Sequence, residues 1–157
     1  MQRDAQIVGL DSPLGPIRLT SSGGEIVAVD WRSGPSLSSA HGGVLHEAAR
    51  QLDAYFAGEL QEFSLPLGLG PGAFQARFQA ALIAIPYGQT RSYGDLAAQL
   101  GVSAQAAGQA CGANRLPILV PCHRVLAANA LGGYSGAGGV ETKVALLKLE
   151  GAAGLLI

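Results

Sequence analysis

The sequence predicts an α/β segment followed by a helical one. Residues 15–21 and 25–31 resemble strands and are joined by a Ser-Gly-Gly turn, which predicts a β-hairpin. Over residues 44–56 the apolar side chains recur every three to four positions, which predicts an amphipathic helix. Beyond the Gly- and Pro-rich segment 65–72 the apolar patterns are short and helical. These observations favour an α/β domain followed by an α-helical domain.

The segment 65–72 is the predicted linker. Its Gly and Pro density places a boundary there, so we predict an N-terminal domain of residues 1–70 and a C-terminal domain of residues 71–157. The first carries four basic and eight acidic side chains, a formal charge of −4, and the second carries six basic and three acidic, +3. A positive excess in the second domain is compatible with a polyanionic partner.

Four helices are expected in the C-terminal domain. The first carries Phe74, Phe78, Ala81 and Leu82 on one face, and the others span 93–100, 104–112 and about 141–150. Ser92 and Asp95 form a predicted capping box for the second helix, which ends at Gly101, and Ser103 is the expected cap of the third. Two helices joined by a tight turn within a basic domain favour a helix-turn-helix arrangement.

The predicted helix 104–112, AQAAGQACG, consists almost wholly of small residues. The glycines of this helix lower its helix propensity, which is unfavourable for folding. We therefore expect its narrow surface to be needed for a close contact. Either this helix packs tightly against another helix, or it comes close to the backbone of a partner.

Residues 121–125, PCHRV, carry the most reactive combination of side chains in the chain. A thiol reacts as its thiolate, and a nearby imidazole raises the thiolate fraction at neutral pH. Cys122 is therefore the candidate nucleophile, His123 the candidate base and Arg124 a fixed positive charge. Neighbouring residues on a straight strand face opposite sides, so Cys122 and His123 can cooperate only if the backbone turns. Pro121 makes such a break plausible.

Two structural interpretations compete with this one. A cysteine beside a histidine is often packed in a core, because free cysteine is among the most buried residue types. A structural zinc site needs about four ligands. The cysteines and histidines of this chain lack the usual paired spacings: Cys111, Cys122, His41, His46 and His123. The sequence therefore gives no indication of a metal site.

Composition limits the cellular setting. With 157 residues and 48% hydrophobic content, the chain can bury an ordinary core. No apolar segment approaches the roughly 20 residues of a membrane helix, and the N-terminal MQRDAQ lacks the apolar core of a signal peptide. Two cysteines without secretory features indicate reduced thiols rather than a disulfide. We expect a cytoplasmic protein that does not bind membranes.

Several blocks of the sequence resemble the O6-alkylguanine-DNA alkyltransferases, the methylated-DNA protein-cysteine methyltransferases. The blocks are IPYGQTRSYGDLA at 85–97, ANRLPILVPCHRV at 113–125, LGGYSG at 131–136 and LLKLEG, which ends at Gly151. The resemblance covers nearly the whole chain. PCHRV is highly specific to this family when the other blocks stand in this order around it.

The resemblance implies an N-terminal ribonuclease-H-like α/β domain and a C-terminal winged-helix domain that holds the cysteine. It also implies single-turnover DNA repair, in which the alkyl group on O6 of guanine moves irreversibly to the cysteine sulfur without a cofactor. The implied partner is double-stranded DNA with an alkylated base, approached from the minor groove with the damaged nucleotide flipped out. We expect the protein to act as a monomer.

The resemblance also assigns roles to individual residues. Cys122 would accept the alkyl group, His123 would act as base through a bridging water, and Glu150 would orient that histidine. Asn114 would brace the turn that presents the cysteine, and Tyr93 would donate a hydrogen bond to the guanine ring. The other expected substrate contacts are Tyr134, Ser135 and Arg124.

Helix 104–112 is the element that the resemblance assigns to the DNA. The expected contacts are Gln105, Ala106, Ala107 and Gly108, together with Arg115 after the helix. Members of the family usually have arginine at position 105, where it fills the gap left by the flipped nucleotide. Gln105 brings no charge and less stacking area, so we expect alkyl transfer to persist and duplex flipping to be weaker. Arg115 and Gln79 also depart from the family, since many members have proline and tryptophan there.

Two other functions compete with repair. A lesion sensor would flip and bind the alkylated base without repairing it, but relatives of that kind replace the cysteine, commonly with tryptophan, and Cys122 argues against this function. A turnover cysteine hydrolase would need an oxyanion hole and a water route to a thioester. No feature of the sequence specifically supports the hydrolase.

Overall fold

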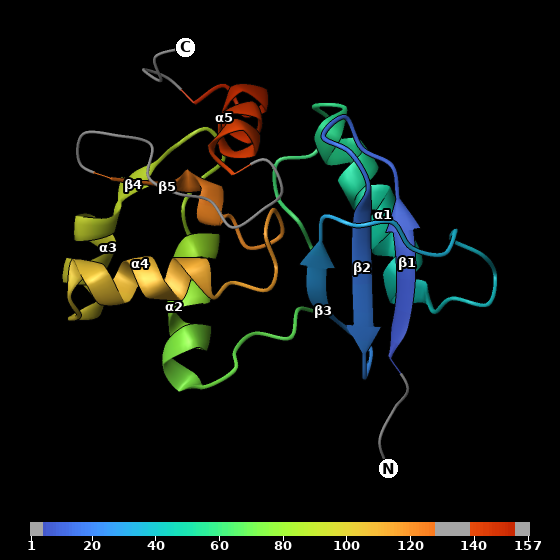
Figure 1. The fold of residues 1–157 in the computed structure, drawn as a ribbon, viewed down its shortest axis with the longest axis horizontal. Helices are drawn as coiled ribbons and strands as arrows, with labels where there is room; N and C mark the ends of the chain where they lie inside the picture. Colours follow the sequence, from blue (N-terminus) through green and yellow to red (C-terminus); the bar gives the residue numbers. More distant parts are fainter. Residues whose placement is uncertain (1–4, 128–138, 153–157) are drawn as a thin grey trace. The chain divides into compact units, whose positions relative to one another are not determined.

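The computed structural model describes residues 5–127 and 139–152. The chain divides into two compact units, residues 1–68 and 69–157, of which the first contains the main sheet and the second is mostly helical (Figure 1). The predicted combination of an α/β segment and a helical segment is therefore confirmed. Across the described ranges, no helix is both long enough and apolar enough to cross a membrane.

The N-terminal unit is a three-stranded antiparallel sheet with one helix on it. The strands are β1 (Gln6–Leu10), β2 (Ile17–Ser22) and β3 (Glu25–Asp30), in the order β1-β2-β3. The predicted hairpin is confirmed as β2 and β3, whose turn uses positive φ angles at Gly23 and Gly24. Strand β1 was not predicted, because its five residues include a glycine and show little alternation.

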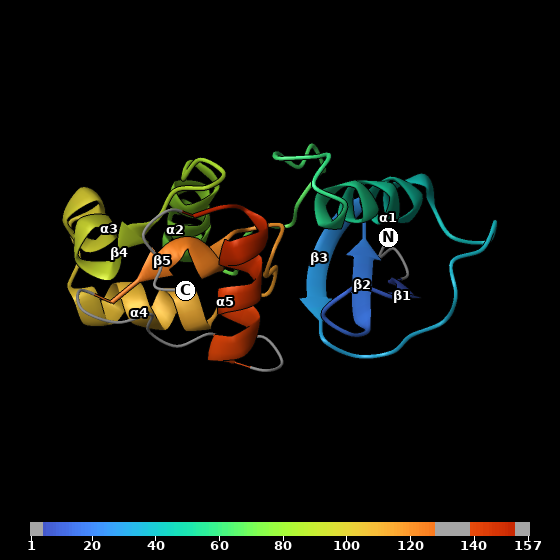
Figure 2. The same ribbon diagram turned by 90° about the horizontal axis from the view of Figure 1, so that it is seen from above.

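Helix α1 (Gly43–Phe56) covers one face of this sheet (Figure 2). In β2 alternate residues are buried, as expected for a sheet with one covered face. The residues with no exposed surface are Val8, Leu19 and Ile26 from the sheet and Leu45, Ala48 and Tyr55 from the helix. This unit therefore has a hydrophobic core of its own.

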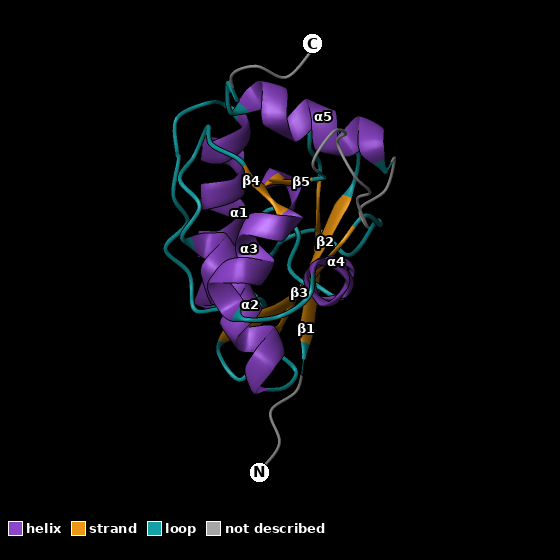
Figure 3. Ribbon diagram, turned by 90° about the vertical axis from the view of Figure 1, so that its left-hand side faces the viewer, coloured by secondary structure: helices purple, strands orange, loops and turns teal. Residues whose placement is uncertain are grey.

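The C-terminal unit contains four α-helices within the described residues. They are α2 (Ala73–Ile83), α3 (Tyr93–Leu100), α4 (Ala104–Gly112) and α5 (Val140–Leu149), drawn in purple in Figure 3. A short parallel pair of strands, β4 (Arg91–Ser92) and β5 (Val125–Leu126), lies among them, and a 3-10 turn, η1 (Cys122–Arg124), precedes β5. All four predicted helices are confirmed.

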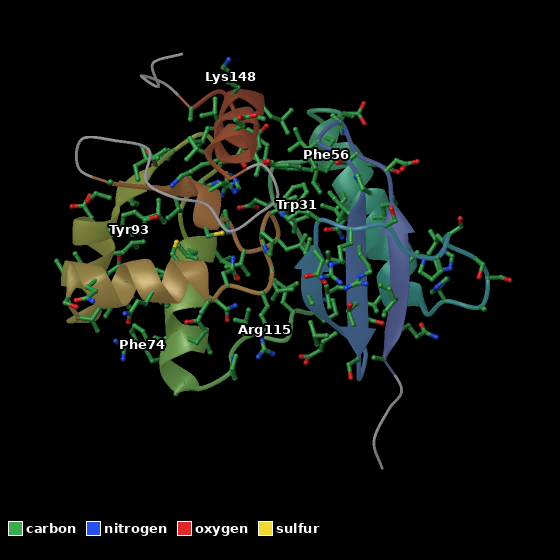
Figure 4. The ribbon with its side chains drawn as sticks, in the orientation of Figure 1. Trp31, Phe56, Phe74, Tyr93, Arg115 and Lys148 are labelled. Atoms are coloured by element: carbon green, nitrogen blue, oxygen red, sulfur yellow. The ribbon has the colours of Figure 1, made fainter. Side chains whose placement is uncertain are left out.

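Local capping sets the ends of the two middle helices. Ser92 accepts a hydrogen bond from the Asp95 amide at 2.9 Å, and the reciprocal bond completes the predicted capping box. Helix α3 ends at Gly101, which has a φ of 71°, and Ser103 caps α4. The apolar face predicted for α2 is only partly buried, because Phe74 at its first turn is 36% exposed (Figure 4).

Candidate active site

Cys122 begins a sharp turn of the backbone. Pro121 has φ −77° and ψ 66°, and the Arg124 amide donates to the Pro121 carbonyl at 3.0 Å. The predicted break at Pro121 is confirmed, so Cys122 and His123 lie on a single helical turn instead of on opposite faces of a strand. The thiol of Cys122 is reduced and only 3% of the residue is exposed.

Asn114 ties together the two ends of the loop that leads to the cysteine. Its Nδ2 donates to the Val120 carbonyl at 3.0 Å, and its Oδ1 accepts from the Leu116 amide at 3.1 Å. Between them, Ile118 has a φ of 74°, which is strained for a β-branched residue. A single buried amide side chain thus holds a strained loop in the shape that presents Cys122.

The strand pair brings the first residue of α3 close to the cysteine turn. Arg91 pairs with Val125 and Ser92 with Leu126, so Tyr93 begins α3 beside the segment that follows η1. Burial, and then the charges of the two thiols, raise the pKa of Tyr93 to about 12. Tyr93 is therefore a protonated phenol at neutral pH, able to donate a hydrogen bond.

Glu150 fixes the tautomer of His123. The Nε2 of His123 lies 2.7 Å from Oε2 of Glu150, and both side chains are fully buried. A carboxylate only accepts hydrogen bonds, so Nε2 carries the proton and Nδ1 keeps a lone pair. Nδ1 is buried and has no hydrogen-bond partner among the described residues. Burial lowers the pKa of His123, against the opposing effect of Glu150, so the imidazole is neutral near pH 7.

Arg124 holds Glu150 from the other side. Its Nε donates to Oε1 of Glu150 at 2.8 Å, its Nη2 to Oε2 at 3.0 Å, and its Nη1 to the Ile85 carbonyl at 2.7 Å. Arg124 is 6% exposed, and its donors are already used inside the protein. These contacts do not support the substrate contact expected of Arg124. Sequence reasoning could not detect this, because spacing does not reveal a buried ion pair.

Two groups near the cysteine were not identified from the sequence. Cys111, on the last turn of α4, has its Sγ 3.8 Å from the carbonyl oxygen of Cys122. Lys143, on α5, is fully buried and its ammonium lies 5.8 Å from the centre of the Tyr93 ring. A lysine in a terminal helix is ordinarily exposed, so no sequence signal pointed to it.

The surroundings lower the pKa of Cys122. A hydrogen bond from Cys111 is the largest cause, and hydrogen bonding from Asn114 and the charge of Lys143 act in the same direction against burial. Burial in turn lowers the pKa of Lys143, while the two sulfurs raise it. The site therefore favours a thiolate at Cys122.

The described parts of the chain contain no candidate metal centre. No group of three or more histidine, cysteine, aspartate or glutamate side chains lies within reach of a common ion there. The cluster around Cys122 is one of thiols, an imidazole paired with a carboxylate, a phenol and an amine.

Two family models match the chain. The DNA-binding domain of 6-O-methylguanine DNA methyltransferase matches residues 73–152, and the ribonuclease-like domain of the same protein matches residues 9–69. The chain belongs to the 6-O-methylguanine DNA methyltransferase family. Cys122, His123 and Glu150 all lie within the DNA-binding-domain match.

Relatives of this methyltransferase family align along most of the chain. It is 46% identical over 149 residues to the methylated-DNA--protein-cysteine methyltransferase of Mycobacterium leprae, covering 90% of this chain and 89% of that protein. The Mycobacterium tuberculosis O6-methylguanine methyltransferase has a similar structure, with a TM-score of 0.82, 40% identity and coverage of 98% and 97%. A structure of Mycobacterium tuberculosis OGT in complex with DNA has a TM-score of 0.79, 44% identity and coverage of 93% and 92%. The family indicated by the sequence blocks is confirmed.

Within the methyltransferase DNA-binding domain, the residues expected to contact DNA differ in exposure. Gln105 and Arg115 are exposed, and Ala106 and Gly108 are partly exposed (Figure 4 labels Arg115). Ala107 is fully buried. The DNA contact expected of Ala107 is therefore not supported, because its methyl group packs inside the protein. Tyr134 and Ser135 lie outside the described residues.

The small residues of α4 serve two different surfaces. Ala107 and Ala110 are buried, so their size suits packing inside the protein. A Cβ built on Gly108 or Gly112 meets no described atom within 4 Å, so packing does not demand glycine there. Tight packing is therefore supported for the buried face of α4, and close approach to a partner stays a prediction for its exposed face.

Proposed function

We propose that Cys122 is the residue that accepts the alkyl group, and that the damaged base is O6-alkylguanine. The protein repairs DNA by direct reversal, with transfer of an alkyl group to a cysteine, as a member of its family. The observation that carries the assignment is the buried 2.7 Å contact between His123 and Glu150, directly beside Cys122. Cys111 is followed by Gly112 and has no such pair next to it in the chain.

His123 is the proposed base. Its Nδ1 lone pair takes the thiol proton of Cys122 through a bridging water, and Glu150 accepts the Nε2–H bond that stabilises the resulting imidazolium. The lowered pKa of His123 keeps the imidazole neutral and ready to accept this proton near pH 7. Arg124 is a positioning residue, since it fixes both oxygens of Glu150.

The transfer is a displacement at the alkyl carbon. The Cys122 thiolate forms an S–C bond while the C–O6 bond breaks, and the bonding electrons leave with the guanine. The guanine anion takes a proton from Tyr93, a protonated phenol near the site with a pKa of about 12. Tyr93 regains a proton from solvent and His123 releases to solvent the proton that it took from Cys122, so the protons balance. Tyr134 and Ser135 remain the proposed pocket contacts.

DNA is the proposed partner, bound through the C-terminal unit. Support comes from the DNA-binding-domain match and from the related structure solved with DNA. The exposed face of α4, with Gln105, Ala106 and Gly108, is the proposed minor-groove surface, and Arg115 adds a positive charge for the phosphates. A thiol as buried as Cys122 requires the lesion to be flipped out of the duplex.

We also propose a monomeric, cytoplasmic protein. Both cysteines are free thiols, which fits a reducing compartment, and the reaction needs one cysteine in one chain.

Peptide mapping by mass spectrometry tests the assignment. The protein is mixed with an oligonucleotide that contains O6-methylguanine, and Cys122→Ala and Cys111→Ala variants are treated in parallel. We expect one methyl group on Cys122 in the wild type and in Cys111→Ala, and none in Cys122→Ala. Binding without a mass change would identify a lesion sensor, and repeated turnover would identify a hydrolase; either result rejects the proposal.

A further inference from the structure

We propose that Cys111 is the hydrogen-bond donor that holds the sulfur of Cys122 as a thiolate before alkyl transfer. This inference rests on the proposed function, because it takes Cys122 as the acceptor. Cys111 belongs to a different element, the last turn of α4, and reaches the cysteine turn from the side of the proposed DNA-binding helix. It acts as a positioning residue, without receiving the alkyl group itself.

The contact between the two cysteine residues is close and buried. The Sγ of Cys111 lies 3.8 Å from the carbonyl oxygen of Cys122, which is within reach of a sulfur hydrogen bond. Cys111 is 7% exposed and Cys122 is 3% exposed. The buried S–H of Cys111 has two acceptors on Cys122. One is the carbonyl oxygen, and the other is the sulfur once the Cys122 thiol has lost its proton.

The two thiols differ in which one keeps its proton. Hydrogen bonding between them is the largest cause of both shifts, and it raises the pKa of Cys111 while it lowers that of Cys122. Cys111 therefore stays protonated under conditions in which Cys122 ionises. Its S–H proton is shared with the thiolate and is not transferred, so the proton released by Cys122 still goes to His123.

Polar groups from several elements lie around the two sulfurs. Tyr93 of α3 and the ammonium of Lys143 on α5 both act on the two sulfurs, and the ammonium lies 5.8 Å from the centre of the Tyr93 ring. Asn114 lies on the loop side, and His123, Arg124 and Glu150 form the buried network beside the turn. Hydrogen bonding from Cys111 lowers the pKa of Cys122 most, and Asn114, the charge of Lys143 and the backbone of Cys122 act in the same direction against burial.

Cys111 interacts with both of the groups proposed to react, Tyr93 and Cys122. Tyr93 is the proposed proton donor to guanine, and Cys122 is the proposed nucleophile. Alkylation converts the Cys122 thiolate into a thioether, which is a weak acceptor. Cys111 then loses its charged partner and is left with the Cys122 carbonyl.

The pH dependence of repair tests this role. Single-turnover transfer from a single-stranded oligonucleotide with one O6-methylguanine is measured from pH 5 to 10 for the wild type, Cys111→Ala and Cys111→Ser. We expect the midpoint of the rise in rate to move up by about one pH unit in Cys111→Ala, with about a tenfold lower rate at low pH and a rate near wild type at high pH. Serine retains a donor, so Cys111→Ser should regain most of the wild-type profile.

Two results would overturn the proposal. An unchanged midpoint in Cys111→Ala means that the thiol does not act on Cys122, and a loss of rate by the same factor at every pH means that Cys111 only packs. If Cys111→Ala does not fold, Cys111→Val fills a similar volume without a donor and receives the same test. Failure of the proposed function is a separate result, since wild-type protein would then carry no methyl group on Cys122.

Discussion

The side-chain amide of Gln79 donates a hydrogen bond to Oδ1 of Asn114 at 3.2 Å, and both residues are buried. The Oε1 of Gln79 accepts from the Gly70 amide at 2.7 Å, which fixes the orientation of the Gln79 side chain. With Oδ1 of Asn114 occupied, its Nδ2 is directed to the Val120 carbonyl. Gln79, which departs from the residue common in the family, thus supports the loop before Cys122.

Replacement of Gln79 should therefore affect chemistry as well as stability. We expect Gln79→Leu to lower the free energy of unfolding by about 1–3 kcal/mol, because it leaves the Gly70 amide without its acceptor and removes one of the two donors to Oδ1 of Asn114. The rate of alkyl transfer should also fall, by about tenfold if the loop shift costs about 1.4 kcal/mol in the transition state. Thermal unfolding and single-turnover kinetics measure the two effects.

Gln75→Leu is the matched control. Gln75 lies one turn earlier on α2, is also buried, and donates to the Ala110 carbonyl at 2.9 Å. It should lose similar stability with little change in the rate. Equal rates for the two variants would remove Gln79 from any role at the site.

Glu150→Gln should slow repair strongly. The variant still has an oxygen to accept from His123, but it cannot stabilise an imidazolium, and Arg124 loses its ion pair inside the protein. Removing one partner of a buried pair costs about 3–5 kcal/mol of stability. Glu141→Gln, an exposed change on α5, is the control. If folded Glu150→Gln transfers the alkyl group at the wild-type rate, Glu150 has no role in catalysis.

Stability should decrease as the pH falls below about 6.5. Burial lowers the pKa of His123 in the folded protein, so the unfolded chain binds a proton first as the pH falls. The stabilisation from neutral His123 is complete above the pKa of this histidine in the unfolded chain. It is lost as the pH falls to the lower pKa of His123 in the folded protein. Thermal unfolding from pH 8 to pH 5 should show this decrease in the wild type and in His46→Gln, an exposed control. If His123→Gln loses the same amount of stability between pH 8 and pH 5, groups other than His123 cause the decrease.

Gly108→Ala tests whether the exposed face of α4 contacts DNA. The added Cβ meets no described atom within 4 Å, and alanine favours a helix by about 1 kcal/mol over glycine, so the melting temperature should rise. If α4 approaches the DNA backbone, the same methyl group should weaken duplex binding. Gly112→Ala has equally open surroundings at the helix end and should leave binding unchanged. Unaltered duplex affinity in Gly108→Ala would move the DNA contact away from this face.

Gln105→Arg should improve repair of duplex substrate more than repair of single strands. Arginine adds charge and stacking area at the exposed position expected to fill the gap left by a flipped base. The ratio of the two repair rates is the measurement. A ratio that does not rise shows that the side chain at this position does not limit flipping.

The sequence was most informative where a feature depends on local order. The capping box of Ser92 and Asp95 and the turn at Pro121 follow from neighbouring residues, and both are present. The contribution of Lys143 could not be predicted, because its burial depends on how α5 packs. The same holds for Arg124, whose charge is used by Glu150, 26 residues further along the chain. Pairs this distant in the sequence are set by tertiary structure.

The number and position of methyl groups per chain test the central claim most directly. Wild-type protein is titrated with an excess of O6-methylguanine oligonucleotide, and repaired lesions are counted against protein. The account predicts one lesion repaired per chain, with the methyl group on Cys122 and the Cys111 thiol unmodified. Methylation of Cys111 in place of Cys122, or repair that continues beyond one lesion per chain, would contradict it.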